Sequence, residues 1–275
     1  MKNLYLPVVV LPVLLTAASA LLTNSWSASV VFVLWVFFSG LGIAVGFHRM
    51  FSHYRKPIAA WLDYLMLVAG TGAGQSSSLS WVAVHNGYHH KFADQHQDPH
   101  SPVAHGSLHA FVGWYCDVDE STFSHRAAIY LASNNRSTAW LHKLTHRHYF
   151  LSFYAIGLVA ASVVAALTPV SFWVAVNSWS LAIALSLIQD NTVNVLGHTP
   201  LEKWPRWMHG WFVYRRYATP DSSANLPFLS WIGWGQFNHN HHHAHPRDFL
   251  FRKPGTLEFD PCVIFKPLVA LGVRD

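Results

Sequence analysis

The chain has 275 residues, of which 52% are hydrophobic and only 11% are charged. A soluble domain usually carries about 25% charged residues, so this composition indicates a membrane protein. The formal net charge of +5 requires no nucleic-acid partner, because anionic lipid headgroups would balance it. Cys116 and Cys262 are the only cysteines and form no CxxC motif, which argues against a disulfide framework or a thiolate metal site.

Two long apolar runs begin the chain, over Leu4–Leu22 and Ser29–Phe47, and the short loop TNSWSA joins them. Each run is close to the roughly 20 residues that a bilayer helix requires. Lys2, an apolar run and the ASA sequence at 18–20 are also the pattern of a cleavable signal peptide. The matching second run favours a retained transmembrane hairpin over that alternative.

The first histidine motif, HRMFSH, follows the second apolar run directly and contains His48 and His53. Side chains five residues apart on an α-helix differ by about 140° in direction, so these two could flank one metal ion without sharing a face. Taken alone, the motif is more typical of interfacial histidines. A fifth apolar run, 61–84, is interrupted by GTGAGQSSS, and we expect it to be interfacial or packed against protein.

The second histidine motif, HNGYHH, contains His85, His89 and His90. Because His85 and His89 are four residues apart, we expect them to stack on one helical face, with His90 beside them. Such a set can present two imidazoles to one ion and one to a neighbouring ion. The alternative interpretation is a solvated polar helix end.

Two further apolar runs, Ser152–Leu167 and Ser171–Ile188, meet at Thr168-Pro169 and predict a second transmembrane hairpin. Neither hairpin turn contains Lys or Arg, and all 18 of these residues lie outside the four predicted spans. By the positive-inside rule, both termini and the central segment are expected to be cytoplasmic.

The last two histidine motifs follow the fourth run. His198 ends the sequence NTVNVLGH, and Asn194, one helical turn earlier, could hold a metal-bound water or support the ligand. The HNHHH segment supplies His239, His242 and His243 at i, i+3, i+4 spacing. A His-rich tract can also be a loose metal trap or an expression tag, but this one lies inside the chain, interleaved with Asn, Ala and Pro.

The four motifs together hold nine histidines on the predicted cytoplasmic side, too many for one metal ion and enough for two. Zinc prefers four tetrahedral ligands and is not redox-active, and no Cys and Met pattern of a blue-copper centre is present. Soluble di-iron proteins use Glu and ExxH pairs, but none of Glu120, Glu202 and Glu258 belongs to an ExxH motif. Two iron ions in an all-imidazole shell fit the count.

With these motifs the chain resembles the membrane fatty acid desaturases over nearly its whole length, and most closely their acyl-CoA (stearoyl-CoA-like) Δ9 group. GFHRMFSH looks like the first histidine box, WVAVHNGYHHKFADQHQDPHSP the second, VNVLGH the NxxxH element and GQFNHNHHHAHP the third; HGSLHAFVGWYC resembles the segment after the second box. The resemblance implies one all-α membrane domain over 1–275, with two transmembrane hairpins, about 4–47 and 152–188, and a cytoplasmic helical cap, 48–150 and 189–275, holding two irons.

The resemblance also implies the ligands and the reaction. Carried over by motif, the iron ligands are nine histidines, with Asn194 acting through water: His48, His53, His85, His89, His90, His198, His239, His242 and His243. The expected reaction uses O₂ to convert a saturated acyl chain, as a CoA or lipid ester, into a cis-monounsaturated one. The resemblance to the Δ9 group implies that the double bond forms at Δ9. No HPGG or flavin motif is present, so an external electron carrier of the ferredoxin or cytochrome b5 type is expected.

Two departures from the family pattern keep other interpretations open. The second box has one extra residue, a spacing found in related hydroxylases, so hydroxylation or ketolation of an alkyl or carotenoid substrate is the alternative. Asp190-Asn191 stands where the family often has Thr-Trp at the bend of the substrate tunnel, which affects the bond position. Gln75 and Trp81 match tunnel positions by their spacing before the second box.

Two further assignments have strong competing interpretations. The headgroup or CoA is expected at basic residues whose alternative role is ordinary positive-inside charge: Arg126, Arg136, Lys143 and Arg147. The total of 20 histidines also suggests a metal transporter or metal store. Transporters place ionisable ligands within their spans near the midplane. The four predicted spans contain no histidine, and the nearest ones lie beyond their cytoplasmic ends.

Overall fold

The computed structural model describes residues 4–54, 57–117, 138–256 and 258–273. Within these ranges the chain is helical, and the β pairing consists of isolated bridges without a strand. The prediction of an all-α fold is therefore confirmed for the described part of the chain. Several helical stretches have π geometry, in which each N–H bonds to the carbonyl five residues earlier, and they carry the label η1 to η4.

Four helical stretches are long and apolar enough to cross a bilayer: Leu6–Thr23, Ala28–His53, Tyr149–Leu167 and Phe172–Gly197. This confirms the four predicted spans. The first consists of η1 and α1 and the second of α2 and η2, while α10 and α11 are the third and fourth. Their bounds are Leu6–Val10 (η1), Leu11–Thr23 (α1), Ala28–Trp35 (α2), Val36–His53 (η2), Tyr149–Leu167 (α10) and Phe172–Gly197 (α11).

The second and fourth helices continue beyond the apolar runs that predicted them, to His53 and Gly197. The added part of η2, HRMFSH, is mostly polar, yet every one of its residues is buried. Arg49 illustrates the reason, because its Nη2 bonds to the carboxylate of Asp260 at 2.8 Å. Protein groups replace lipid around this end of the helix, so its polar residues are paired instead of ending the span.

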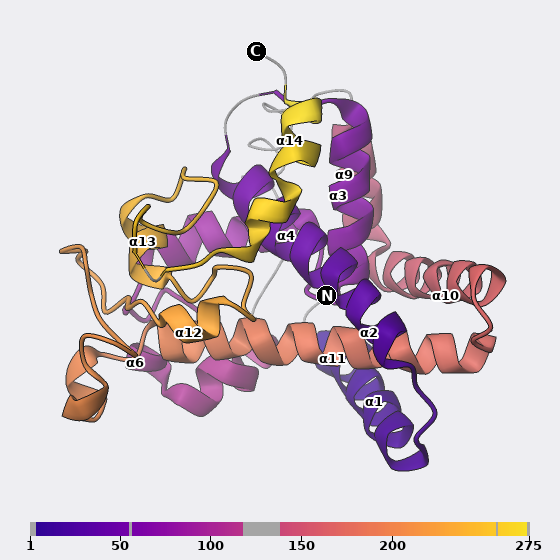
Figure 1. The fold of residues 1–275 in the computed structure, drawn as a ribbon, viewed down its shortest axis with the longest axis horizontal. Coiled ribbons are helices and arrows are strands. Elements are labelled where there is room, and N and C mark those ends of the chain that lie inside the picture. Colours follow the sequence, from indigo (N-terminus) through magenta and orange to yellow (C-terminus); the bar gives the residue numbers. More distant parts are fainter. Residues whose placement is uncertain (1–3, 55–56, 118–137, 257, 274–275) are drawn as a thin grey trace.

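α11 is the helix around which the other long helices are arranged (Figure 1). α1, α2 and α10 pack against it, and α3 (Ala60–Gly72) packs against η2 and α10. A Cβ atom on Gly42 of η2 would lie 2.5 Å from the backbone of Ala69 in α3, so glycine permits this close approach. α3 is the first half of the interrupted apolar run, and its packing against protein agrees with the sequence expectation.

Three of the short elements gather at one part of this frame. α6, α12 and α13 lie around the left-hand part of α11 in Figure 1, away from the turn that joins α11 to α10. Histidine-bearing segments from distant parts of the sequence are thereby brought together. The short elements are α4 (Ser78–Val84), η3 (His85–His89), α5 (His90–Phe92), α6 (Pro102–His105), η4 (His109–Gly113), α7 (Trp114–Asp117), α9 (Ala139–Arg147), η6 (Leu201–Lys203), η7 (Arg206–Met208), α12 (Pro227–Ser230), α13 (His239–Ala244), η8 (Pro261–Phe265) and α14 (Lys266–Gly272).

Candidate metal centre

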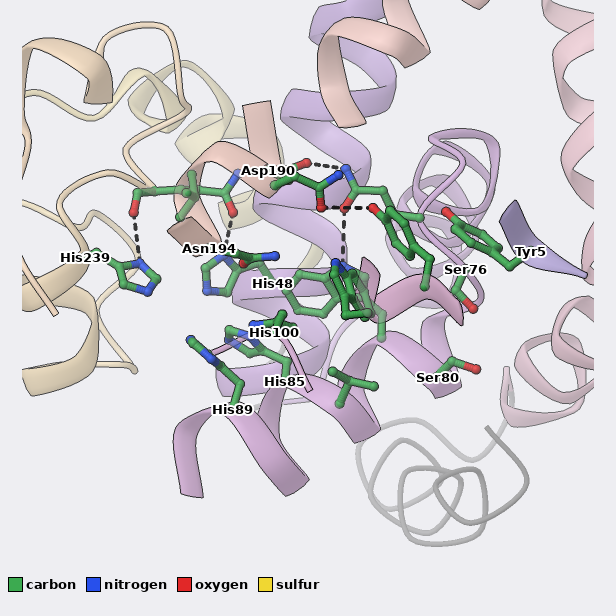
Figure 2. Close-up of a pocket in the computed structure, with 18 residues that line it drawn as sticks. Tyr5, His48, Ser76, Ser80, His85, His89, His100, Asp190, Asn194 and His239 are labelled. Atoms are coloured by element: carbon green, nitrogen blue, oxygen red, sulfur yellow. Dashed lines mark hydrogen bonds between the residues drawn. The ribbon is translucent and has the colours of Figure 1, made fainter. Parts of the chain in front are cut away.

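A cavity of about 100 Å³ lies between the ends of the long helices and the short elements. Figure 2 shows His85, His89, His100 and His239 toward one end of the cavity, with Asn194 among them, and Tyr5, Ser76 and Ser80 toward the other end. Gln75, Trp81 and Asn194, which the sequence placed in the tunnel or at the metals, all line this cavity. Its other lining residues include Tyr5, His48, Ser76, Ser80, Val84, His85, His89, His100, Trp114, Tyr115, Asp190, Asn191, Val193, Gln236 and His239.

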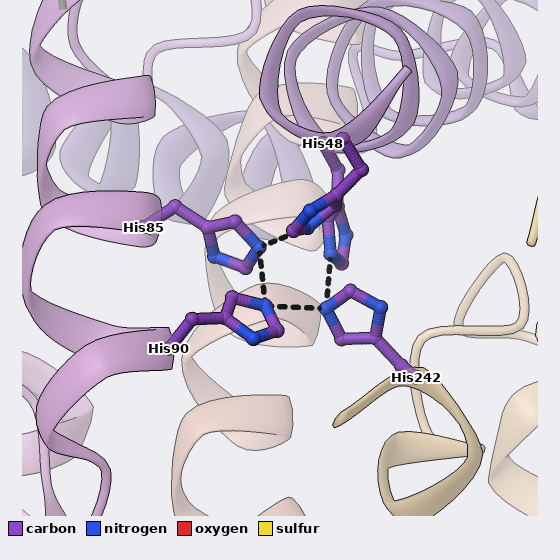
Figure 3. Close-up of side chains that lie close together, drawn as sticks. His48, His85, His90 and His242 are labelled. Atoms are coloured by element: carbon purple, nitrogen blue, oxygen red, sulfur yellow. Dashed lines mark hydrogen bonds between the residues drawn. The ribbon is translucent and has the colours of Figure 1, made fainter. Parts of the chain in front are cut away.

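The first histidine group has five members, whose ligand nitrogens all lie within 4.8 Å of one another: His48, His53, His85, His90 and His242. Figure 3 shows the labelled rings turned toward one point. Nε2 of His242 lies 2.9 Å from Nε2 of His48 and 2.8 Å from Nε2 of His90. Two imidazole nitrogens bound at right angles to one ion at about 2.1 Å each lie about 3 Å apart, so the spacing fits a single metal ion.

The second histidine group has four members within the same limit of 4.8 Å: His89, His198, His239 and His243. Nε2 of His198 lies 3.0 Å from Nε2 of His239 and 3.3 Å from Nε2 of His89. All nine histidines that the sequence singled out thus fall into two groups. His89 and His90 are adjacent in the chain and belong to different groups, so the groups lie next to each other.

Helix geometry decides which histidines share a group, and it corrects one expectation. His48 and His53 lie at the end of π-helical η2, and His85 and His90 are joined by a π-type bond from the N–H of His90 to the carbonyl of His85. In a π turn the residue five positions on lies one turn away on the same side. The α-helical angle of about 140° for the first pair is therefore wrong. In the second motif the rings of His85 and His89 are stacked, as expected, with centroids 5.6 Å apart. The two imidazoles that share a group are those of His85 and His90, and His89 belongs to the neighbouring group.

The third histidine segment divides its side chains between the groups in the way an α-helix requires. α13 directs His239 and His243, which are four residues apart, to the second group, and His242 to the first. A Cβ atom on Gly197, the last residue of α11, would lie 2.9 Å from the ring of His239. Glycine therefore lets the end of α11 approach α13 closely enough for His198 to join the second group.

Carboxylates hold the outward-facing nitrogens of the second group. Nδ1 of His89 bonds to Asp98 at 2.9 Å, and Nδ1 of His243 bonds to Asp221 at 2.8 Å. An imidazole that donates its Nδ1–H to a carboxylate keeps the Nε2 lone pair available for a metal, and metal-bound histidines typically have such partners. Sequence reasoning missed both acids. The DPH sequence after the second box contained a signal for Asp98, whereas nothing near Asp221 in the sequence indicates its role.

In the first group a glutamine side chain accepts the hydrogen bond from a histidine Nδ1, as the carboxylates do in the second. Nδ1 of His48 donates to Oε1 of Gln236 at 3.0 Å, and both residues are buried. The backbone carbonyl of Gln236 accepts from Nδ1 of His239 at 3.1 Å. Gln236 therefore contacts one histidine of each group, although the sequence analysis assigned it no role.

Burial favours the neutral form of four histidines in the two groups: His85, His90, His242 and His243. Desolvation, together with the neighbouring imidazoles, lowers the pKa of His85, His90 and His242 well below its ordinary value. Burial lowers the pKa of His243 to about 4, although its hydrogen bond to Asp221 acts in the opposite direction. Neutral imidazole is the form that binds metals, so these side chains are ready to coordinate at neutral pH.

The basic residues proposed for the headgroup lie elsewhere. Lys143 and Arg147 are exposed on α9 and are not among the residues that line the cavity. Arg126 and Arg136 lie outside the described residues. Of the four candidates, Lys143 and Arg147 are thus exposed near the segment that carries the second histidine box, since α9 packs against α4.

Four long apolar helices and two adjacent histidine groups define the class: a helical membrane protein with a candidate metal centre beside a cavity. The family model described as "Fatty acid desaturase" matches residues 5–248, which is more than half of the chain. The protein belongs to the fatty acid desaturase family.

Three relatives show the range of similarity. Delta-9 acyl-lipid desaturase 2 of Arabidopsis thaliana is 29% identical over 80% of this chain and 64% of its own length. The sn-1 stearoyl-lipid 9-desaturase of Synechocystis is 28% identical over 80% of this chain and 62% of its own. A probable acyl-CoA desaturase of Schizosaccharomyces pombe is 24% identical over 87% of this chain and 46% of its own length. The chain thus spans less than two thirds of the length of these relatives.

Proposed function

We propose that this protein is a fatty acyl desaturase, which uses O₂ and two electrons to convert a saturated acyl chain into a cis-monounsaturated one. The observation that carries the proposal is the convergence of nine imidazoles into two adjacent groups beside a cavity. Imidazole donors suit iron, and the spacing of the nitrogens suits one ion in each group. When bound, two iron ions supply the oxidising power that hydrogen removal from an unactivated methylene requires, because no side-chain base can abstract that hydrogen.

The protein's own residues hold and orient the centre. His48, His53, His85, His90 and His242 would bind one iron ion; the second group, with Asn194 acting through water, would bind the other. Asp98, Asp221 and Gln236 keep three of the rings in the tautomer that leaves Nε2 free. The cavity would hold the acyl chain with one C–C bond next to the two ions, so positioning is the protein's main contribution.

The substrate assignment is drawn from the relatives. Two of them are named as acyl-lipid or stearoyl-lipid 9-desaturases and one as an acyl-CoA desaturase, so we propose a CoA or lipid ester desaturated at Δ9. Trp81 would line the acyl site, since its ring packs 4.6 Å from that of His85 and 5.4 Å from that of His48. Lys143 and Arg147 would meet the anionic headgroup or CoA at the surface.

The proposed setting is a bilayer with both termini and the metal centre on the cytoplasmic side. The distribution of Lys and Arg, which are absent from both hairpin turns, supports this orientation. The proposal treats 1–275 as one domain whose short elements form the cap over the ends of the spans. A separate ferredoxin or cytochrome b5 type of carrier would supply the electrons.

The longer second box does not favour hydroxylation or ketolation. Its extra residue is absorbed in the π turn of η3, and its three histidines remain within the two groups. The relatives described above are named as desaturases. Membership of this family also argues against a metal store or transporter.

Expression in a host that lacks its own monounsaturated fatty acids tests the proposal. Gas chromatography with double-bond localisation should detect a new cis-monounsaturated fatty acid with the wild-type chain. His242→Ala should abolish it, whereas His245→Ala should not, because His245 is exposed and belongs to neither group. An unchanged lipid profile with folded, iron-loaded protein would overturn the proposal, and a product that retains oxygen would indicate hydroxylation.

A further inference from the structure

A chain of hydrogen bonds connects Asp190, on the cavity wall of α11, to the first histidine group (Figure 2). Nε2 of Gln236 donates to Oδ1 of Asp190 at 2.7 Å, and Oε1 of the same amide accepts from Nδ1 of His48 at 3.0 Å. The opposite nitrogen of His48, Nε2, lies 2.9 Å from Nε2 of His242 inside the group. One amide therefore separates the carboxylate from a proposed iron ligand.

The chemistry of the two ends dictates how this chain is oriented. Both carboxyl oxygens of Asp190 accept from side-chain NH₂ groups, so Gln236 turns its NH₂ toward Asp190. The carbonyl oxygen of Gln236 then faces His48, and that oxygen can only accept, so the proton of His48 must lie on Nδ1. The lone pair of His48 is thereby placed on Nε2, where the first group converges.

A second amide supports the carboxylate from the other side. Nε2 of Gln75 donates to Oδ2 of Asp190, and Oε1 of Gln75 accepts from the indole N–H of Trp81 at 3.4 Å. Because an indole can only donate, it orients Gln75 with its NH₂ toward Asp190. Gln189 adds a longer bond to Oδ1 at 3.3 Å. Asp190 thus receives amide donors on both oxygens, and each of the two main donors has its orientation fixed.

We propose that Asp190 is a positioning residue for the metal centre: through Gln236 it sets the tautomer of His48 and so secures the ion of the first group. The inference rests on the proposed function, because it takes the first group to bind a metal. Asp190 would thus do more than line the tunnel, and Gln236 would connect it to His48 of the first group.

The direct test replaces the carboxylate with an amide of the same shape, Asp190→Asn. The new side chain has one acceptor oxygen for two amide donors, so Gln236 is no longer held in a single orientation. Where the asparagine NH₂ faces Gln236, that amide turns over to avoid a donor facing a donor. Its NH₂ then meets Nδ1 of His48, and the ring proton moves to Nε2, where it blocks the metal. We expect the affinity for one of two ions to fall about 10–100-fold, with the other unchanged. Titration of metal-free protein in detergent with Co²⁺, followed by visible absorption, measures both affinities.

A compensating exchange separates this role from a general structural one. In Asp190→Asn/Gln236→Glu the glutamate accepts from both the new asparagine and Nδ1 of His48, which restores the original tautomer. Asn191→Ala is the matched control: Asn191 also lines the cavity on α11, but bonds to Tyr115 at 3.0 Å instead of to Gln236. The double variant and the control should bind both Co²⁺ ions with affinities within about threefold of the wild type. This change is smaller than the roughly 10–100-fold loss expected when a ligand loses its hydrogen-bond partner.

The outcomes are distinct. Loss of one ion in Asp190→Asn with recovery in the double variant supports the proposal. Unchanged affinities in Asp190→Asn, or a double variant that is no better than the single one at equal thermal stability, would overturn it. Failure of the wild-type chain to bind two Co²⁺ ions would instead contradict the proposed function on which the inference rests.

Discussion

His85 and His90 lie on the same side of their helix, with Nε2 atoms 3.1 Å apart, although five residues separate them in the sequence. The N–H of His90 bonds to the carbonyl of His85, which makes the intervening turn a π turn. His48 and His53 have the same spacing, also within a π-helical segment. Both pairs belong to the first histidine group, so the wider helix is what assembles four of its five members.

The π turn predicts that the length of the second box can be shortened but not increased. Gly87 is exposed and has no atom near its Cβ position, so its deletion removes no packed side chain. The deletion leaves His85 and His90 four residues apart, which an ordinary α turn places on one face. We expect the shortened chain to keep two metal ions, with affinities within about tenfold of the original.

Insertion of an alanine after Gly87 is the matched change in the other direction. It would place His85 and His90 six residues apart, where neither an α nor a π turn aligns them. Metal analysis of the purified variant should show that the ion of the first group is lost. If the insertion retained two ions while the deletion lost one, the role assigned to the π turn would be wrong.

The carboxylate behind His89 is expected to control the second ion. Asp98 is buried and bonds to Nδ1 of His89, so Asp98→Ala should lower the affinity for one ion about 10–100-fold. Asp248→Ala is the control, because Asp248 is exposed and pairs with His241, which belongs to neither group. Equal losses in the two variants would show that the effect is not transmitted through His89.

Glu258 gives the fold a dependence on pH that is separate from the metal centre. Burial raises the pKa of this carboxyl, but bonds from Tyr214, Arg216 and the N–H of Lys253 outweigh burial and hold the pKa below its ordinary value. A lowered pKa in the folded state contributes stability above the unfolded pKa of about 4.3, and that stability is lost as the pH falls.

The corresponding measurement is the melting temperature of the wild-type chain and of Glu258→Gln between pH 7 and pH 3. The variant should be less stable than the wild type at pH 7, by about 1–3 kcal/mol for an ionised group with buried partners. The difference should shrink toward zero as the pH falls below the unfolded pKa. A difference that stayed constant over this range would show that ionisation of Glu258 does not stabilise the fold.

The four spans and the grouping of the histidine motifs at their ends could be read from the sequence. The length and composition of an apolar run indicate a bilayer helix without knowledge of its neighbours. Nine histidines in four short motifs likewise indicate a metal site, because imidazole is the commonest metal ligand. The pairing of His85 with His90 could not be read in this way. Periodicity arguments assume about 100° for each residue, whereas the π turn forms only where tertiary contacts stabilise it.

The partners of the histidines were less predictable than the histidines themselves. Asp221 lies 22 residues from His243 and Gln236 lies 188 residues from His48, so no local spacing links either residue to the ring whose Nδ1 it contacts. Asp190 was recognisable only as an unusual residue at a tunnel position. Its role toward His48 depends on the orientation of one amide, which follows from the fold and not from spacing.

Iron analysis of anaerobically purified protein tests the central claim, that the two histidine groups are two metal sites, most directly. The wild-type chain should contain about two tightly held iron ions, and His242→Ala, which removes a ligand of the first group only, should contain about one. His245→Ala should keep both. Variable amounts of zinc, or an unchanged iron content in His242→Ala, would contradict the claim.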